Sequence, residues 1–333
     1  MKKIRVAING FGRIGRTFLR NCSKYPQIEV VCINDLTTTK TLAHLFKYDS
    51  VHKQFNGEIS YTETSLVINS KIIKVTAIKN PEELPWKELD VDIVLESTGL
   101  FLTKEHLQKH IKAGAKRVIL SAPAKDDDVV SIVLGVNDEV LTKDVQIISN
   151  ASCTTNCAAP MLKVLLPYEI EEAYITTVHS YTNDQRIHDA PHKDLRRARA
   201  AAMSIIPTST GAAKAITKIF PDLAGKIGGC GMRVPVPNGS LTDITCVLKR
   251  PVTVNELNEA YKKAANHELK GILAYTDEPI VGVDVIGNSN SVLFDAEFTS
   301  IVGNLVKVIG WYDNEWGYSN RCVDLVVKMA QYI

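Results

Sequence analysis

The chain has 333 residues, 45% of them hydrophobic, which suits two hydrophobic cores better than three. It carries 39 basic and 37 acidic side chains, a net charge of +2, so no overall field favours nucleic acid or a membrane as partner. No apolar run is long enough to span a bilayer, and the start of the chain enters a strand pattern without the apolar core of a signal peptide. The 7 scattered cysteines, an odd number, indicate a reducing compartment rather than a disulfide framework. We therefore expect a cytoplasmic α/β protein.

A glycine motif follows the first predicted strand, residues 4–9, and opens a helical pattern. It has the form G-x-G-x-x-G, with glycines at Gly10, Gly12 and Gly15. Such glycines let the backbone approach a pyrophosphate, which the helix N-terminus then attracts. A second strand, residues 28–34, ends at Asp35, 20 positions after Gly15, where a carboxylate can accept from ribose hydroxyls and repel a 2′-phosphate. The glycines alone could serve only tight packing, but the full arrangement favours dinucleotide binding with NAD as cofactor.

The rest of the first half alternates strands and helices. Helical patterns cover 40–48 and 104–112, short strands fall within 59–75, and buried strands cover 91–96 and 117–120. Strand 91–96 delivers Ser97-Thr98-Gly99 to its carboxyl end, where ligands of open parallel sheets bind, so this turn is expected to border the nicotinamide. These patterns predict a Rossmann domain, that is, a doubly wound parallel sheet.

Cys153 lies between a predicted strand, residues 145–148, and a predicted helix, residues 158–166. A cysteine at such a junction faces unpaired backbone N–H groups and the positive end of the helix dipole, and both favour the thiolate. We therefore expect Cys153 to attack a carbonyl carbon. Cys157 follows at a spacing that zinc sites tolerate, but no second pair or Cys/His cluster accompanies it, so no metal site is expected.

His179 follows a β-branched strand, residues 173–178, and lies 26 positions after Cys153. An imidazole beside the sulfur would stabilise the thiolate and act as base and then as acid. An ordinary structural histidine fits the spacing equally well.

Three features further along the chain suit phosphate groups. The segment 182–199 ends in a basic cluster, residues 207–214 open a helix with hydroxyl groups, and Arg233 follows within residues 232–237 (MRVPVP). A solvated helix face is the usual role of a basic cluster, but three such features after a candidate nucleophile favour a phosphorylated substrate and free phosphate.

The remainder carries strand-like runs at 242–248, 292–298 and 305–311, with helices at 253–266 and 320–331. This pattern predicts an α+β catalytic domain with a mostly antiparallel sheet. We expect the dinucleotide-binding domain at 1–151, joined by the C-terminal helix 316–333, and the catalytic domain at 152–315.

Three stretches together identify a family resemblance: residues 8–16 (INGFGRIGR), 151–156 (ASCTTN) and 311–315 (WYDNE). The chain resembles phosphorylating glyceraldehyde-3-phosphate dehydrogenase from end to end. The resemblance implies an NAD-dependent enzyme of glycolysis or gluconeogenesis that converts D-glyceraldehyde 3-phosphate to 1,3-bisphosphoglycerate. It implies Cys153 as nucleophile, His179 as its base, a hemithioacetal, hydride transfer to NAD and a thioester that inorganic phosphate cleaves.

The resemblance also assigns binding residues. Cofactor contacts fall on the glycines of the motif and on Arg13, Ile14, Asp35, Ser121 and Asn314. The substrate phosphate falls on Thr182 and Arg233, and the attacking phosphate falls on Ser152, Thr154, Arg197, Thr210 and Gly211. The resemblance further implies a homotetramer in which the 182–199 segment packs against a neighbour's cofactor site, and a final helix that packs on the first domain.

Two positions depart from the family pattern. Ala190-Pro191 is intermediate between the residues typical of NAD-specific and of NADP-using members, although Asp35 still predicts a preference for NAD. Gly239 stands where the family usually has valine, and we expect the glycine to loosen local packing.

Two other functions remain as alternatives. Erythrose-4-phosphate dehydrogenase is similar, but its members lack the element that stands here as Thr210 to Ala213. A non-catalytic nucleotide-binding or RNA-binding protein would be expected to have lost site residues, whereas Cys153, His179 and Asn314 are all present.

Overall fold

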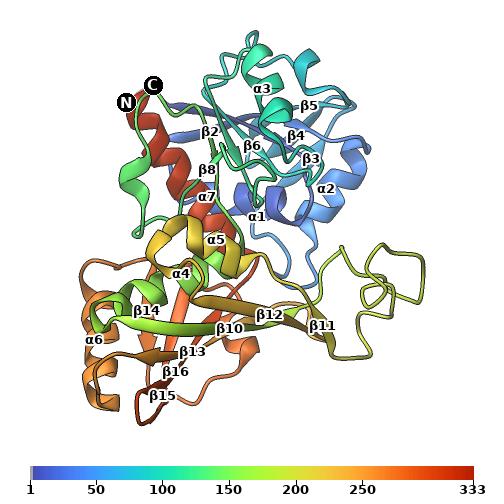
Figure 1. Ribbon diagram of the computed structural model, residues 1–333. Helices are drawn as coiled ribbons and strands as arrows, with labels where there is room; N and C mark the ends of the chain where they lie inside the picture. The colour runs from blue at the N-terminus through green and yellow to red at the C-terminus, as the bar shows by residue number, and fades with distance from the viewer. Residues whose placement is uncertain (1–2) are drawn as a thin grey trace. The chain divides into compact units, whose positions relative to one another are not determined.

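The computed structural model describes residues 3–333, and the chain divides into two compact units (Figure 1). The first unit contains the residues up to Ile132, Asp138–Ala151 and Ser319–Ile333. The second contains Val133–Asn137 and Ser152–Tyr318. None of the helices described between residues 3 and 333 is long and apolar enough to cross a membrane.

The first unit is built on a sheet in the order β3-β4-β5-β2-β1-β6-β7-β9-β8 (Figure 1). Its parallel strands are β5 (Lys71–Thr76), β2 (Ile28–Asn34), β1 (Ile4–Asn9), β6 (Ile93–Glu96), β7 (Arg117–Leu120), β9 (Ile147–Ser149) and β8 (Val130–Ser131). The antiparallel strands β4 (Ser65–Ile68) and β3 (Ile59–Tyr61) complete one edge. Its helices include α1 (Arg13–Cys22), α2 (Thr39–Lys47) and α3 (Lys104–Lys112). All four residues of β6 and of β7 are buried, as expected in the centre of a parallel sheet.

The second unit carries a sheet in the order β11-β12-β10-β13-β16-β15-β14. Its strands are β10 (Ile170–Ser180), β11 (Ile206–Thr208), β12 (Ile227–Val234), β13 (Ser240–Leu248), β14 (Leu273–Thr276), β15 (Val292–Val302) and β16 (Leu305–Tyr312). Only the β10–β12 and β14–β15 pairs are parallel among these neighbours. Its helices are α4 (Cys153–Leu165), α5 (Ala212–Ile219) and α6 (Val254–Asn266). The predicted fold class, a Rossmann-type parallel sheet with a mostly antiparallel second sheet, is confirmed.

Helix α4 lies tightly against the second sheet, which holds the N-terminal end of the helix in place. A Cβ atom at Gly310 would stand 2.6 Å from the Met161 sulfur, so only glycine permits this approach. The Cys157 sulfur is buried and lies 3.7 Å from the Gly310 carbonyl oxygen. The Met161 carbonyl also accepts from the Tyr261 hydroxyl of α6 at 2.9 Å.

Three elements illustrate where the structure adds to or differs from the sequence-based expectations. Strand β12 is not apparent from the sequence because three of its residues, Gly228, Gly229 and Gly231, are glycines. Helix α4 begins at Cys153 rather than at Ala158. Helix α7 (Trp316–Met329) begins at the expected start of the C-terminal segment, residue 316, and not at Asn320, where the apolar stripe begins, because Asp313 Oδ1 accepts from the backbone N–H of Trp316 at 2.7 Å.

Gly239 does not loosen the packing, and that expectation is wrong. The residue adopts φ +88°, and a Cβ atom there would lie 2.1 Å from the Gly282 carbonyl oxygen. Gly239 therefore permits a close approach of two backbone segments that a side chain would prevent.

Candidate active site

Cys153 is the first residue of α4 in the second unit. The Ser152 side chain caps this helix, because its Oγ accepts from the Thr155 backbone N–H at 3.0 Å. Ser152 Oγ also lies 2.8 Å from the Thr155 hydroxyl oxygen. The predicted nucleophile therefore sits at the positive end of the helix dipole, as the strand–helix junction suggested.

His179 approaches Cys153 from β10, with His179 Nε2 3.4 Å from Cys153 Sγ. The Ser180 carbonyl oxygen lies 2.7 Å from the other ring nitrogen, Nδ1. A carbonyl can only accept, so it favours the tautomer with hydrogen on Nδ1. That tautomer leaves the Nε2 lone pair facing the sulfur, where it can take the thiol proton.

Arg233 joins this pair because β10 and β12 run parallel with His179 opposite Arg233 in the register. Arg233 Nη1 lies 2.6 Å from His179 Nδ1 and donates to the Ser180 carbonyl at 2.9 Å. A guanidinium can only donate, so its 2.6 Å contact with Nδ1 favours the opposite tautomer, with hydrogen on Nε2. The tautomer with hydrogen on Nδ1 requires this contact to lengthen, with the Ser180 carbonyl as acceptor for both groups. A strand that the sequence did not reveal thus places the predicted phosphate-binding arginine beside the predicted base.

Burial opposes the charged form of both partners. It raises the pKa of the Cys153 thiol, although Arg233 and the backbone N–H of Thr154 act in the opposite direction. Burial and the neighbouring Arg233 lower the pKa of His179 to about 3. In the free chain this arrangement favours a thiol and a neutral imidazole, which differs from the thiolate expected from the helix dipole alone.

A buried cluster of three hydroxyl groups, those of Tyr312, Thr154 and Thr177, lies next to Cys153 and His179. The Tyr312 hydroxyl lies 3.0 Å from Thr154 Oγ1 and 2.9 Å from Thr177 Oγ1, and so connects α4, β10 and β16. The Tyr312 and His179 rings meet edge-to-face with centroids 6.0 Å apart. No sequence motif predicted a role for Thr177 or Tyr312, although Tyr312 lies within the WYDNE stretch.

The other predicted phosphate residues lie on the segments after β10. Arg197 forms ion pairs with Asp184 and, at 3.4 Å, with Asp194. Its positive charge also contributes to the lowered pKa of Arg233. Thr210 Oγ1 accepts from the Ala212 N–H at 3.2 Å, just before α5. The remaining two are Gly211, which caps α5 without a side-chain bond, and Thr182, whose N–H donates to Gln185 Oε1 at 3.3 Å.

Asn314, the predicted cofactor contact in the second unit, is buried and oriented by a short chain of hydrogen bonds. Its Oδ1 accepts from Ser240 Oγ at 2.7 Å, and Ser240 Oγ accepts from the Ser180 N–H at 3.1 Å. The chain of bonds therefore fixes the amide of Asn314 relative to the end of β10.

In the first unit, the glycine motif forms the turn between β1 and α1. Gly10 adopts φ +92°, and a Cβ atom at Gly15 would lie 2.3 Å from the Gly10 carbonyl oxygen, so both positions need glycine. A Cβ atom at Gly12 would meet nothing within 4 Å, and no side chain caps α1 there. The start of α1 is therefore open to an anionic group such as a pyrophosphate.

The other predicted cofactor residues of the first unit surround this turn. Asp35 Oδ2 accepts from the Phe11 N–H at 2.8 Å, which fixes the carboxylate beside the glycines. Arg13 pairs with Asp49 at 2.5 Å, and Ile14 is half-buried in the first turn of α1. Ser121 follows β7, where its N–H donates to the Glu96 carbonyl at 2.9 Å.

Comparisons with known proteins agree with this reading of both units. Residues 4–104 match the family model of the glyceraldehyde 3-phosphate dehydrogenase NAD-binding domain, and residues 152–314 match that of the C-terminal domain. The chain belongs to the glyceraldehyde-3-phosphate dehydrogenase family. The resemblance inferred from the sequence is thus confirmed, as is NAD as the cofactor of the first unit.

Curated family members are similar over almost the whole chain. Glyceraldehyde-3-phosphate dehydrogenase of Geobacillus stearothermophilus is 56% identical over 330 residues, which cover 98% of each chain. That of Thermotoga maritima is 56% identical over 332 residues, 98% of this chain and 99% of its own. Glyceraldehyde-3-phosphate dehydrogenase 2 of Streptomyces avermitilis is 54% identical over 334 residues and 99% of each chain.

No group of three or more His, Cys, Asp or Glu side chains among residues 3–333 is arranged to hold a metal ion. The seven cysteines are all unpaired, and Cys153 is one of two that are not fully buried.

Proposed function

We propose that this chain oxidises D-glyceraldehyde 3-phosphate to 1,3-bisphosphoglycerate with NAD and inorganic phosphate. The observation that carries the proposal is the 3.4 Å contact between Cys153 Sγ and His179 Nε2 in a member of this dehydrogenase family. A nucleophile and its base within reach of one another are the minimum that covalent aldehyde oxidation requires.

The proposed mechanism uses His179 as a proton carrier. His179 Nε2 accepts the Cys153 proton, Sγ bonds to the aldehyde carbon, and the imidazolium protonates the oxygen to give a neutral hemithioacetal. His179 next takes the hydroxyl proton while the hydride on that carbon leaves, so a thioester forms. Bound NAD supplies the hydride acceptor. Inorganic phosphate then attacks the thioester, and the departing sulfur regains a proton from His179.

Arg233 gives this mechanism a dependence on substrate charge. Its guanidinium contributes to the low pKa of His179, which makes the imidazole a weak base in the free chain. A substrate phosphate held by Arg233 and Thr182 would offset that positive charge and raise the pKa of His179 towards its usual range. The attacking phosphate would bind Ser152, Thr154, Thr210, Gly211 and Arg197, and Arg197 would exchange a carboxylate partner to do so.

For NAD, we propose contacts with Gly10, Gly12, Arg13, Ile14, Gly15, Asp35 and Ser121 in the first unit and Asn314 in the second. The open start of α1 at Gly12 supports the pyrophosphate position, and the fixed carboxylate of Asp35 supports the ribose position. We accordingly propose residues 1–151 and 316–333 as the dinucleotide-binding domain and 152–315 as the catalytic domain.

We also propose a cytoplasmic homotetramer. Several large apolar side chains of the segment between β10 and β11 are exposed, including Ile187 at 82%, Leu195 at 81% and Met203 at 78%. Exposed apolar groups of this number on one segment favour a contact with another copy of the chain. Native mass spectrometry should detect four chains, and a monomer at micromolar concentration would contradict the proposal.

The test of the activity is NADH formation from glyceraldehyde 3-phosphate, followed at 340 nm with and without inorganic phosphate. We expect phosphate-dependent activity that Cys153→Ser abolishes and that Cys230→Ser, a control at the half-buried cysteine of β12, retains. Phosphate-independent oxidation would favour the erythrose-4-phosphate dehydrogenase alternative. Full activity of Cys153→Ser would contradict the mechanism, and absence of any turnover by the wild type would favour a non-catalytic nucleotide-binding role.

A further inference from the structure

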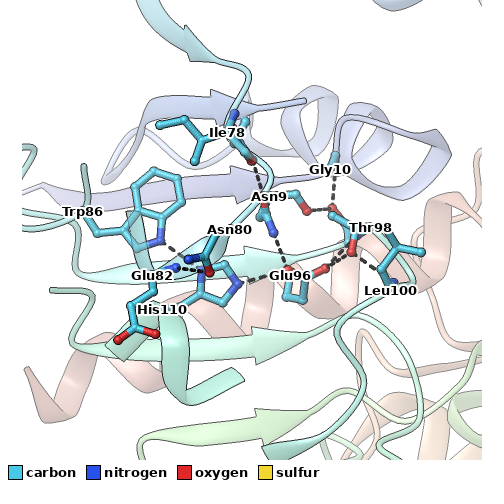
Figure 2. Close-up of polar contacts among 12 residues, drawn as sticks. Asn9, Gly10, Ile78, Asn80, Glu82, Trp86, Glu96, Thr98, Leu100 and His110 are labelled. Atoms are coloured by element: carbon cyan, nitrogen blue, oxygen red, sulfur yellow. Dashed lines mark hydrogen bonds and ion pairs between the residues drawn. The ribbon is translucent and has the colours of Figure 1, made fainter. Parts of the chain in front are cut away.

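Strand β6 ends in a carboxylate that water does not reach. The Glu96 side chain is 0% exposed, in the first unit, beneath the glycine turn (Figure 2). A buried carboxylate is costly unless hydrogen bonds replace its hydration. The partners of Glu96 therefore indicate what this side chain does at this position.

Four hydrogen-bond donors converge on the two oxygens of Glu96 (Figure 2). The backbone N–H of Thr98, at 2.8 Å, and the Thr98 hydroxyl both donate to Oε1. Asn9 Nδ2, at 2.6 Å, and His110 Nε2, at 3.0 Å, both contact Oε2. Each oxygen thus has two partners, and the carboxylate needs no water.

The neighbour of His110 settles which atom donates. Trp86 Nε1 lies 3.0 Å from His110 Nδ1, and an indole nitrogen can only donate. His110 Nδ1 must accept this bond, so the ring hydrogen is on Nε2 and points at Glu96. All four partners of Glu96 can therefore donate to its carboxylate, two to each oxygen.

Three of these donors lie at two turns: the glycine turn, which is proposed to bind NAD, and the Ser97–Gly99 turn, which is expected to border the nicotinamide. Thr98 belongs to the turn after β6, and Asn9 directly precedes Gly10. Ser97 Oγ donates to the Gly10 carbonyl at 2.7 Å, and a Cβ atom at Gly10 would lie 2.7 Å from the Thr98 nitrogen. The two turns are thus packed backbone to backbone, and Glu96 holds both from beneath.

We infer that Glu96 is a positioning residue for the cofactor: its buried carboxylate, through Thr98 and Asn9, fixes the glycine turn and the Ser97–Gly99 turn in the arrangement that binds NAD. His110 and Trp86 extend the support to α3 and the core. The inference rests on the proposed NAD contacts of these turns. The glycine motif and the Asp35 carboxylate are proposed to contact NAD themselves, whereas Glu96 acts only through the residues that it holds.

The decisive variant is Glu96→Gln, which keeps the shape but offers one oxygen acceptor to four donors. We expect isothermal titration of the cofactor-free protein with NAD+ to show binding at least about tenfold weaker, the effect of losing one charge-assisted hydrogen bond. Glu88→Gln, at an exposed glutamate paired with Lys74, is the matched control and should bind NAD+ like the wild type. The alkylation rate of Cys153 by iodoacetamide without NAD+, a property of the second unit, should not change in either variant.

Each outcome distinguishes between explanations. Wild-type affinity in Glu96→Gln would overturn the positioning role, and so would a slower Cys153 alkylation that accompanied the weaker binding, because the effect would then be general. If Glu96→Gln does not fold, His110→Leu is the second variant, because it removes the one donor to Glu96 that comes from α3. This variant should weaken NAD+ binding about threefold or more. Unchanged binding of that variant would also overturn the role. Failure of the wild type itself to bind NAD+ would instead contradict the proposed function.

Discussion

Gly239→Val returns the chain to the residue that its family usually carries, and such changes commonly stabilise a protein. The structure predicts the opposite. At φ +88° a side chain costs about 1–2 kcal/mol in the left-handed region. The new Cβ atom would also start 2.1 Å from the Gly282 carbonyl oxygen, and the backbone shift that relieves this contact costs about 1–3 kcal/mol more. We therefore expect the free energy of unfolding to fall by about 2–5 kcal/mol, a large part of a typical total.

Urea unfolding followed by circular dichroism measures this loss. Gly271→Val is the control, because Gly271 adopts φ +79° but a Cβ atom there meets nothing within 4 Å. It isolates the backbone cost, so it should destabilise the protein clearly less than Gly239→Val. Equal losses in the two variants would show that the contact with Gly282 is irrelevant. An unchanged or higher stability of Gly239→Val would refute the reasoning altogether.

Three further predictions concern the active site. His179→Asn should lower the rate of NADH formation by about a hundredfold or more while NAD binding is retained, and lost binding would indicate a structural role instead. The pKa of His179 is about 3 in the folded chain, against a usual value of 6.5. Between pH 6.5 and 3 the imidazole of the unfolded chain therefore binds a proton that the folded chain does not bind, so the free energy of unfolding falls as the pH falls. From pH 7 to 5 the wild type should lose about 2 kcal/mol of unfolding free energy that His179→Asn does not lose, and parallel urea curves for the two proteins would contradict this assignment. Finally, Asp35 should make kcat/KM for NADP at least about tenfold lower than for NAD, whereas comparable values would show that Ala190-Pro191 decides the preference.

Local sequence signals predicted part of the fold well. Helices α3 and α6 begin where expected because Thr103 and Thr253 accept from backbone N–H groups three residues on. A helix cap of this kind joins residues only three positions apart, so it can be predicted from the sequence without knowledge of the tertiary structure. The cap of α7 is equally local, since Asp313 precedes Trp316 by three positions, and residue 316 was the expected start of the C-terminal helix.

Other features depend on contacts that no local pattern contains. The spacing of Cys153 and His179 was compatible with a structural histidine, and only their 3.4 Å separation makes them a pair. Burial reverses the expected effect of the helix dipole on the Cys153 thiol, and burial is a property of the whole unit. The same holds for His110, because Trp86 and Glu96 contact it only in the folded chain.

The pairing of β10 with β12 has a consequence for how the protein becomes active. Glycine-rich strands specify their register weakly, and β12 carries three glycines while it must place Arg233 opposite His179. A shift by one residue would present Met232 or Val234 to the base and turn the guanidinium to the other face of the sheet. A chain misaligned in this way could regain most of its secondary structure without a competent site. Recovery of activity during refolding would then report the alignment of these two strands rather than the compaction of the chain.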